Sequence, residues 1–529
     1  MSVIAKARQR LARWIAPPPP AKPAKASRMY ANAKTSRLTN GWNAPNDSAD
    51  SELISSLMTL RARSRALVRD APYAKRAKIV VVNNVIGSGI GMQAQVKNQR
   101  GRLMDDVNNA IEAAWAEWCC AENCHTGGRL HFSDLERQLM GQVFEGGEIF
   151  VRKHYRTFGR SKVPLALEIV EPERLAEDYT QPLVTGSSIF KMGIEQDEFG
   201  RPVAFWMRRV HPSEVRMNSR TASDYLYRVP ADQMFHLAVV DRWPQTRGEP
   251  WLHAVARRLE DMDGLSEAEI VAARGAASYM GVRKPAGVDD PTAVDPDEPT
   301  PEFDLEPGAV VTLNPGEEFE FVAPNRPNAN LDPFMRFMLR EVAAGIPIPY
   351  ESISGDWSQS NFSSSRMGQH EYRDSYTALQ QWFIRSFRKV LHAEWLQSAV
   401  LAGAIPAIDR VAYALNPQKF EAATFKPRGW SYINPKDDIA AAKEAIKAGL
   451  STRTHEIARY GNGLDVEDID TVRRQELDQA AEKDLAFDTD PEAYAQKPTE
   501  VAPPAEEEEV DPPEAATDTA RVVPLRSNA

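Results

Sequence analysis

The stretch that decides the fold lies at residues 331–366 and reads LDPFMRFMLREVAAGIPIPYESISGDWSQSNFSSSR. Its first half predicts a helix with Asp332 as N-cap and Pro333 at the first helical position, where a proline loses no hydrogen bond. Gly345 is the expected C-cap, and the two prolines that follow it prevent the helix from continuing. We therefore expect a helix with an abrupt end.

Residues 352–366 predict a polar loop that leads into a second helix. The segment is rich in Ser, Gln and Asn and holds one large aromatic residue, Trp357. From about Ser363 to Ala402 only Gly368 interrupts a helical pattern. A loop held between two helices is suited to pointing at a partner.

Composition limits what the chain does. Its 529 residues suffice for several domains, and three cysteines favour a reducing compartment over a disulfide framework. We expect no signal peptide and no membrane span, because no apolar run approaches the ~20 residues that cross a bilayer. A net charge of −10 argues against tight nucleic-acid binding.

The two ends differ sharply in charge. Residues 1–46 contain no Asp or Glu, whereas Glu506 to Glu509 form an acidic run. We expect a basic, flexible arm rich in Pro and Ala at residues 1–48 and an acidic disordered tail at residues 488–529. The apolar residues of the arm fit one or two amphipathic turns: Ile4, Ala7, Leu11, Trp14 and Ile15. A disordered arm and a peptide that docks on a partner or an anionic surface both remain open.

The middle of the chain predicts helices, then strands, then helices. Ser133 and Glu136 form a capping box that opens a helix, and residues 147–240 predict mainly antiparallel strands, including Ile189 to Ile194. A helix from Trp251 to Asp263 is expected next. A second capping box, Ser266 with Glu269, predicts another helix to about Val282.

Two short motifs resemble ligand-binding sites, one for a nucleotide and one for zinc. A structural role explains each of them better. Gly87 to Gly91 resembles a dinucleotide turn, but Met92 stands where the third glycine belongs, so a tight glycine turn is favoured. Three cysteines and an imidazole fall together at Cys119, Cys120, Cys124 and His125. A zinc site is the minor alternative there, because no second Cys pair exists.

Motifs of the common enzyme classes are not recognisable. The sequence has no GxSxG, HExxH, Walker or EF-hand pattern, and Asp356 in the loop is a lone carboxylate. We therefore expect no enzyme activity, no catalytic or metal residues and no cofactor.

Several longer segments are similar to one family, the lambda-type portal proteins of tailed bacteriophages. Besides residues 334–366, they are LRARSRALVRDAPYA at 60–74, VNNVIGSGIGMQ at 82–93, EGGEIFVR at 145–152, GIEQDEFGRPVAFW at 193–206 and DRWPQTRGEPW at 241–251. The resemblance covers roughly residues 28–480. It departs from the family's pattern at Asn434, where Asp is usual.

This resemblance implies an α+β portal fold. The implied regions are a wing at 49–245, helices leading into the stem at 246–283, a small α/β clip at 284–328, a second stem helix at 329–345, a tunnel loop at 346–363, a long helix returning to the wing at 364–433 and crown helices at 434–487. The tunnel loop would face DNA with Asp356, Trp357, Ser358, Gln359, Ser360 and Asn361. The clip would dock a motor or connector with Asp289, Asp290, Asp295, Asp297, Glu298 and Glu302.

The resemblance also implies partners. They are further copies of the chain in a ring, expected to number twelve, the terminase large subunit, a head-completion protein, the major capsid protein, scaffold and non-specific double-stranded DNA in passage. The protein would sit at a capsid vertex of the virion after assembly in the host cytoplasm. The alternatives are another capsid structural protein and a nucleotide-binding enzyme that uses the glycine turn. Whether Trp357 faces DNA or a neighbouring subunit stays open.

Overall fold

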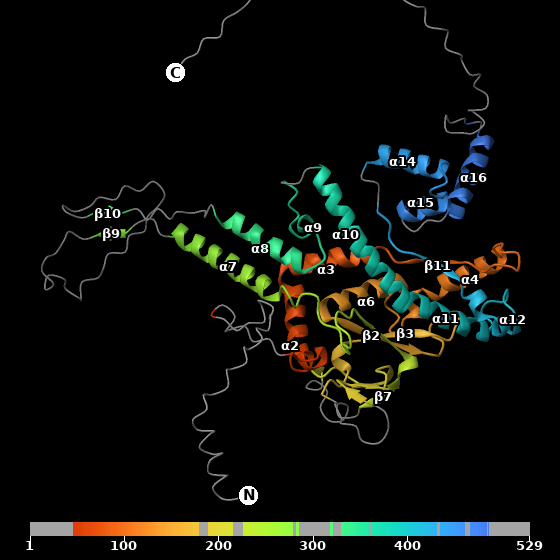
Figure 1. The fold of residues 1–529 in the computed structure, drawn as a ribbon, viewed down its shortest axis with the longest axis horizontal. Coiled ribbons are helices and arrows are strands. Elements are labelled where there is room, and N and C mark those ends of the chain that lie inside the picture. Colours follow the sequence, from red (N-terminus) through yellow and green to blue (C-terminus); the bar gives the residue numbers. More distant parts are fainter. Residues whose placement is uncertain are drawn as a thin grey trace, which may run out of the picture. The chain divides into compact units, whose positions relative to one another are not determined.

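In a computed structural model of the chain, the structure describes residues 37, 46–178, 189–214, 226–278, 282–284, 318–320, 330–358, 362–430, 434–460, 466–483 and 485. The chain forms two compact units, one of residues 1–89 and 94–423 and the other of residues 90–93 and 424–529. Helices and antiparallel strands are both present, so the α+β class is confirmed (Figure 1).

Three helices form the helical layer at the start of the first unit. Helix α2 (Ala49–Asp70) begins where the Ser48 hydroxyl accepts a hydrogen bond from the Ser51 amide. Helix α3 (Pro72–Val85) begins with a proline, and both helices pack on α6 (Phe132–Gly146). Two further helices lie between them in the chain, α4 (Asp105–Trp118) and α5 (Ala121–Cys124).

The expected capping box at the start of α6 is wrong. The N-cap is His131, whose ring accepts the Ser133 amide, while Glu136 is 1% exposed and lies 3.3 Å from Arg388 Nε. Glu136 does not cap the helix because a buried guanidinium without a carboxylate partner would cost more free energy than an uncapped helix end.

Two antiparallel sheets follow, which confirms the β-rich segment. In the first, β2 (Glu148–His154) lies between β3 (Ala166–Val170) and β8 (Met234–Ala238), with Val151 opposite Ile169 and Phe235. The second has the order β4–β5–β6–β7, with strands Ile189–Lys191, Ile194–Gln196, Pro202–Met207 and Tyr227–Pro230. Side chains of both sheets meet in one core that includes Phe150, Val170, Phe205 and Met207. Two short 3-10 turns border the strands, Pro172–Arg174 and Ala231–Gln233.

The single strand expected from Ile189 to Ile194 is a hairpin instead. Met192 and Gly193 adopt left-handed φ values of 45° and 83° and turn the chain between β4 and β5. A Cβ on Gly193 would lie 2.7 Å from the Ala176 carbonyl oxygen. The turn is therefore set by a close backbone approach that periodicity does not reveal.

A single helix, α7 (Ala256–Ser278), replaces the two expected between residues 251 and 282. The Ser266 hydroxyl donates to the Met262 carbonyl at 2.9 Å, so it continues the helix and does not cap a new one. The expected helix end is wrong too, because β9 (Val282–Lys284) pairs antiparallel with β10 (Glu318–Glu320). Residues 285–317 of the expected clip lie outside the described residues.

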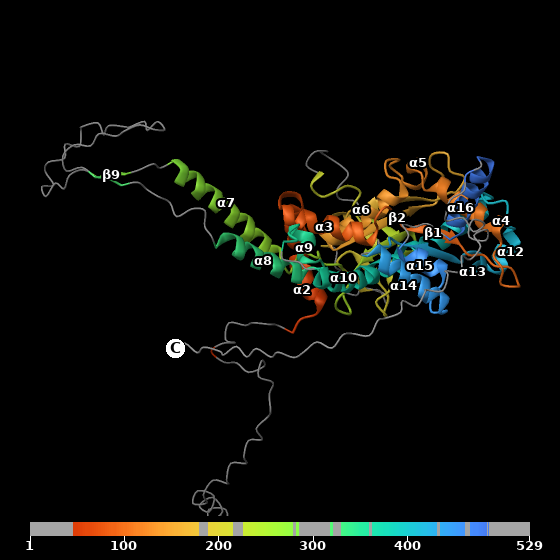
Figure 2. The same cartoon turned by 90° about the horizontal axis from the view of Figure 1, so that it is seen from above.

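Helix α8 (Leu331–Gly345) runs beside α7, as Figures 1 and 2 show, and Arg258 Nε on α7 lies 3.1 Å from Glu341 on α8. Its N-cap is Asn330, so the expected Asp332 cap is wrong; Asp332 instead accepts Arg336 Nε at 3.0 Å.

The long helix after the loop contains a π-helical turn. Helix α10 (Phe362–Phe383) passes through Ile384–Arg388 into α11 (Lys389–Ala402). The π turn places the Arg388 guanidinium over the rings of Trp115 and Phe132 at 5.0 and 4.9 Å. Burial, reinforced by Arg388, lowers the pKa of nearby His392 to about 4. Two short helices close the unit, α12 (Arg410–Leu415) and α13 (Pro417–Phe420).

The second unit combines a small sheet with three helices. Strands β1 (Gly91–Ala94) and β11 (Ala423–Lys426) pair, and the expected helices appear as α14 (Pro435–Lys447), α15 (Arg453–Tyr460) and α16 (Val466–Glu482). Gly449 has a φ of 73° after α14, as expected of its helix-ending role. Trp430 is half-buried. Across the described segments of both units, no helix combines the length and apolar character needed to cross a membrane.

Replacing Gly264 by Ala should stabilise the protein. Gly264 lies inside α7, and a Cβ there would have no heavy atom within 4 Å. The change should add about 0.5–1 kcal/mol to the free energy of unfolding, because alanine loses less conformational entropy in a helix. Chemical denaturation of Gly264→Ala measures this gain. The matched variant Gly101→Ala, which is equally open but has a φ of 76°, should lose stability.

Candidate functional site

The expected loop starts from a firmly packed helix end. Gly345 is the last residue of α8 and the C-cap is Ile346, so the expected Gly345 cap is wrong. A glycine fits there because a Cβ would lie 2.4 Å from Val255 Cγ1. The φ angle of Gly345 is not positive, so Gly345 is not a left-handed helix cap. The next apolar residues, Ile346 and Ile348, are 2% and 0% exposed. The start of the loop is therefore part of the core of the first unit.

A short helix that the sequence did not reveal forms the body of the loop. Helix α9 (Tyr350–Ser354) packs on α3 and α8, and its Ile353 is 3% exposed. Arg76 Nε on α3 donates to the Ser352 carbonyl at 3.0 Å. Gly355 then turns the chain out of the helix with a φ of 71°.

Asp356 organises the turn that follows. Its carboxylate accepts the Ser358 amide at 3.0 Å and the Ser358 hydroxyl at 2.6 Å, and lies 3.5 Å from Arg336 Nη1. The hydrogen bonds from Ser358, with Arg336 nearby, lower the pKa of Asp356, so it is anionic at neutral pH. From the sequence, Asp356 was expected to be a carboxylate without a catalytic partner. In the structure its carboxylate stabilises a turn through Ser358.

Trp357 lies at the outer side of this turn and is 51% exposed. The other predicted loop residues, Gln359, Ser360 and Asn361, lie outside the described part of the chain. So do the six acidic residues predicted for the clip: Asp289, Asp290, Asp295, Asp297, Glu298 and Glu302. Of the six residues predicted for the tunnel loop, the structure therefore describes Asp356, Trp357 and Ser358.

The base of the loop carries arginines, and each is engaged by the loop or its own helix. Arg336 pairs with Asp332 and Asp356, the Arg340 guanidinium lies 5.4 Å from the Tyr350 ring centroid, and Arg76 binds the Ser352 carbonyl. Arg76 is 276 residues away from its partner in sequence, so no local pattern could have revealed this contact.

A buried ionic cluster joins α2, β2 and the segment before α7. Glu148 is 0% exposed. Its carboxylate accepts hydrogen bonds from Arg247 Nη2 at 2.5 Å, Arg61 Nη2 at 3.0 Å and the Gly248 amide at 3.1 Å. His236 Nε2 lies 2.8 Å from the same carboxylate. Burial opposes ionisation of Glu148, but Arg247, His236 and Arg61 outweigh it and hold its pKa far below the ordinary value.

Two glycines complete this cluster. A Cβ on Gly147 would lie 2.4 Å from the Glu249 carbonyl carbon, and one on Gly248 would lie 2.2 Å from the Gly147 oxygen. The segments EGGEIFVR and DRWPQTRGEPW, far apart in sequence, therefore meet backbone to backbone around the Glu148–Arg247 pair.

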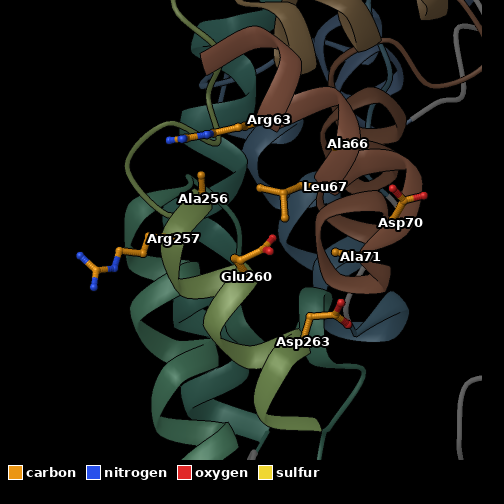
Figure 3. Close-up of a pocket in the computed structure, with 9 residues that line it drawn as sticks. All are labelled: Arg63, Ala66, Leu67, Asp70, Ala71, Ala256, Arg257, Glu260 and Asp263. Atoms are coloured by element: carbon orange, nitrogen blue, oxygen red, sulfur yellow. The ribbon is translucent and has the colours of Figure 1, made fainter. Parts of the chain in front are cut away.

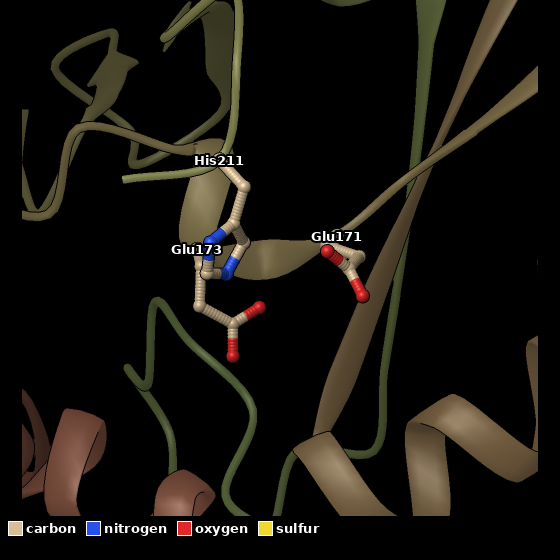
Figure 4. A group of neighbouring side chains, drawn as sticks. All are labelled: Glu171, Glu173 and His211. Atoms are coloured by element: carbon tan, nitrogen blue, oxygen red, sulfur yellow. The ribbon is translucent and has the colours of Figure 1, made fainter. Parts of the chain in front are cut away.

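One cluster of described residues has the composition of a metal site: Glu171, Glu173 and His211 (Figure 4). Their ligand atoms lie within 4.8 Å of one another. Glu173, however, already accepts Arg65 Nη1 at 2.8 Å. A cation would compete with that guanidinium, so we assign the cluster no metal role.

The cysteines behave as core residues. Cys124 Sγ lies 3.4 Å from the Cys119 carbonyl oxygen, and burial raises the pKa of the Cys124 thiol to about 12. Burial also raises the pKa of the Cys119 thiol well above its ordinary value. Cys119 and Cys124 are therefore protonated, buried side chains of the core at neutral pH.

The glycine turn after α3 lacks the context of a nucleotide site. A helix precedes it where a dinucleotide fold has a strand. Gly87 and Gly89 have φ values of 65° and 121°, and a Cβ on Gly89 would lie 2.8 Å from Ser133 Cβ. A tight glycine turn packed on α6 is thus confirmed.

Comparison with known families identifies the class. The model described as "Phage portal protein, lambda family" matches residues 35–380, which is more than half of the chain. The chain belongs to the lambda family of phage portal proteins.

Individual relatives carry the same name. The chain is 29% identical over 469 residues to the probable portal protein of Halomonas phage phiHAP-1, covering 85% of this chain and 87% of the relative. It is 21% identical to the portal protein of Escherichia phage N15, covering 86% and 90%. It is also 21% identical to portal protein B of Escherichia phage lambda, covering 80% and 84%.

Two solved structures are also similar to the chain. The neck of an empty GTA particle has a TM-score of 0.45 at 14% identity and covers 79% of this chain and 96% of that one. The neck of a native GTA particle has a TM-score of 0.40 at 14% identity, covering 75% and 93%.

Proposed function

We propose that copies of this chain form a ring at one capsid vertex, and that DNA passes through it during packaging and ejection. Membership of the portal family supports this, as does an acidic composition, because a net charge of −10 avoids the counterion release that would hold a duplex in place. Twelve copies, a virion vertex location and assembly in the host cytoplasm belong to the proposal.

The loop between α8 and α10 is the proposed contact with DNA. The observation that carries this is that Arg336, Arg340 and Arg76 each contact a residue of the loop. Trp357 and hydroxyl groups therefore remain on the outer side. Such groups make weak, exchangeable contacts that permit sliding. In this proposal Gln359, Ser360 and Asn361 extend the surface begun by Asp356.

The other regions follow in the same proposal. Helices α7 and α8 form the stem, residues 284–328 the clip, the sheets with α2 to α6 the wing, and α14 to α16 the crown. The clip docks the terminase large subunit and, later, a head-completion protein, while the outer surface meets the major capsid protein and scaffold. Electron microscopy of purified protein should show rings with an axial hole; shells or monomers alone would contradict the assembly.

Replacing residues 356–361 by a Gly/Ser linker should impair DNA packaging or retention while rings still form. The change removes the Asp356 turn and Trp357 but leaves the buried Ile348 and Ile353 in place. A DNase-protection assay on assembled heads measures packaged genomes. A linker of the same kind at the exposed turn 98–101 should have no effect. Normal packaging by the loop variant would refute its contact with DNA.

A further inference from the structure

A groove lies between α2 and α7, well away from the loop in the chain, with a volume of about 620 Å³ (Figure 3). Its lining residues come from the last two turns of α2 and the first two turns of α7: Arg63, Ala66, Leu67, Asp70, Ala71, Ala256, Arg257, Glu260 and Asp263. Leu67 and Ala71 are themselves 7% and 6% exposed, so the floor is apolar and firmly packed.

The lining of the groove holds three carboxylates, Asp70, Glu260 and Asp263, and two guanidiniums, Arg63 and Arg257. Figure 3 shows Glu260 and Asp263 extending from α7 toward α2, whereas Arg257 points away. Within the described part of the chain neither carboxylate has a hydrogen-bond or ion-pair partner; Arg257 and Arg258 lie near Asp261 instead. Because they are three residues apart on a helix, they lie on one face about one turn apart.

We propose that residues 4–15 of the same chain dock in this groove. This N-terminal segment lies outside the described residues, and its apolar positions share one helical face, with Leu11 and Trp14 three residues apart. Arg10 and Arg13 have the same spacing as Glu260 and Asp263, so two adjacent turns present two cations to two anions. Leu11 and Trp14 cover the apolar floor.

The tether permits this contact within one chain. Thirty residues lie between Ile15 and Asn46, at the start of the described segment that leads into α2, and an extended chain of that length spans roughly 100 Å. From Ala49 to Leu67, α2 rises only about 27 Å. Linkage at this length gives a local concentration on the order of 1 mM, so even weak docking is well populated. The inference does not depend on ring assembly or DNA passage.

Hydrogen exchange on the full-length protein tests the docking. Amides of residues 4–15 should exchange about tenfold more slowly than in an unstructured chain, and Glu260→Gln with Asp263→Asn should remove most of this protection. The matched control Glu267→Gln, exposed on α7 but outside the groove, should leave it unchanged. Unprotected amides in the wild type, or equal protection in the double variant, overturn the proposal.

Charge reversal and cross-linking complete the test. Glu260→Lys with Asp263→Lys should abolish protection, and adding Arg10→Glu with Arg13→Glu should restore it. An Ala7→Cys, Ala256→Cys pair in a Cys120→Ser background, which keeps Leu11 and Trp14, should form a disulfide within one chain. Cross-links between chains alone would overturn docking within the chain and would identify a second copy as the occupant. The absence of any cross-link would also overturn the proposal.

Discussion

Replacing Glu148 by Gln should cost about 3–5 kcal/mol of unfolding free energy in the first unit, because two buried guanidiniums lose their shared countercharge. Arg61 and Arg247 are 1% and 0% exposed, and Glu177 accepts one hydrogen bond from each of them, while Glu173 lies 3.9 Å from Arg61. Glutamine matches glutamate in size, so the loss reports charge and not packing. Calorimetry should show the unfolding transition of the first unit lowered by roughly 5 °C or more.

Asp178→Asn is the matched control. Asp178 forms an ion pair with Arg208, but its side chain is 77% exposed, so its loss should cost less than about 1 kcal/mol. Equal effects of the two substitutions would show that the Glu148 cluster is not the stabilising centre that its burial indicates.

The pH dependence supplies a second check on Glu148. Because its folded pKa lies below the ordinary value of 4.5, the carboxylate contributes stability above that pH and loses the contribution as the pH falls. The difference between wild type and Glu148→Gln should therefore be full at neutral pH and shrink in acid below about pH 4.5. A constant difference across this range would contradict the assignment.

Replacing Gly147 by Ala should be at least as damaging, because the new methyl group meets backbone atoms that have no rotamer with which to yield. The Cβ would lie 2.4, 2.6 and 2.7 Å from atoms of Glu249 and Gly248, and the φ of 86° adds strain. Relief requires moving β2 from the 247–250 segment, which would break the Glu148–Arg247 pair. We expect a loss of roughly 3 kcal/mol or more and a low soluble yield.

Gly200→Ala separates the two causes. Gly200 has a nearly equal φ of 80°, but a Cβ there would have nothing within 4 Å. It should lose about 1 kcal/mol, which is the cost of the backbone conformation alone. If both variants unfold at the same midpoint, the close approach at Gly147 contributes nothing.

Several local signals in the sequence were overruled for a common reason. Ser133 with Glu136 and Ser266 with Glu269 both match a capping box, yet Glu136 turns to Arg388 and Ser266 bonds back to Met262. Asp332 likewise binds Arg336 and does not cap its helix. Capping contributes about 1 kcal/mol, which a buried ion pair or a continuous helix readily exceeds.

The candidate loop was located from sequence but its internal structure was not. Pro347 and Pro349 predicted that the first helix ends before them, and α8 does end at Gly345. Helix α9 was missed because five residues carry too little periodicity, and its stability comes from contacts with α3 and α8. The Asp356 turn and the engagement of Arg76 likewise need the folded chain.

By itself the sequence determined the succession of helical and β-rich segments, the end of α8, the charge of the two ends and the resemblance to portal proteins, because these depend on periodicity, Pro and Gly positions and composition. Only the tertiary structure decided that Arg61, Glu148 and Arg247 share one buried site, and that Gly147 meets Gly248. It also decided that residues 350–354 form a short helix that packs on α3. These contacts join residues up to 276 positions apart, and which of many charged partners meet is fixed by packing that no local pattern encodes.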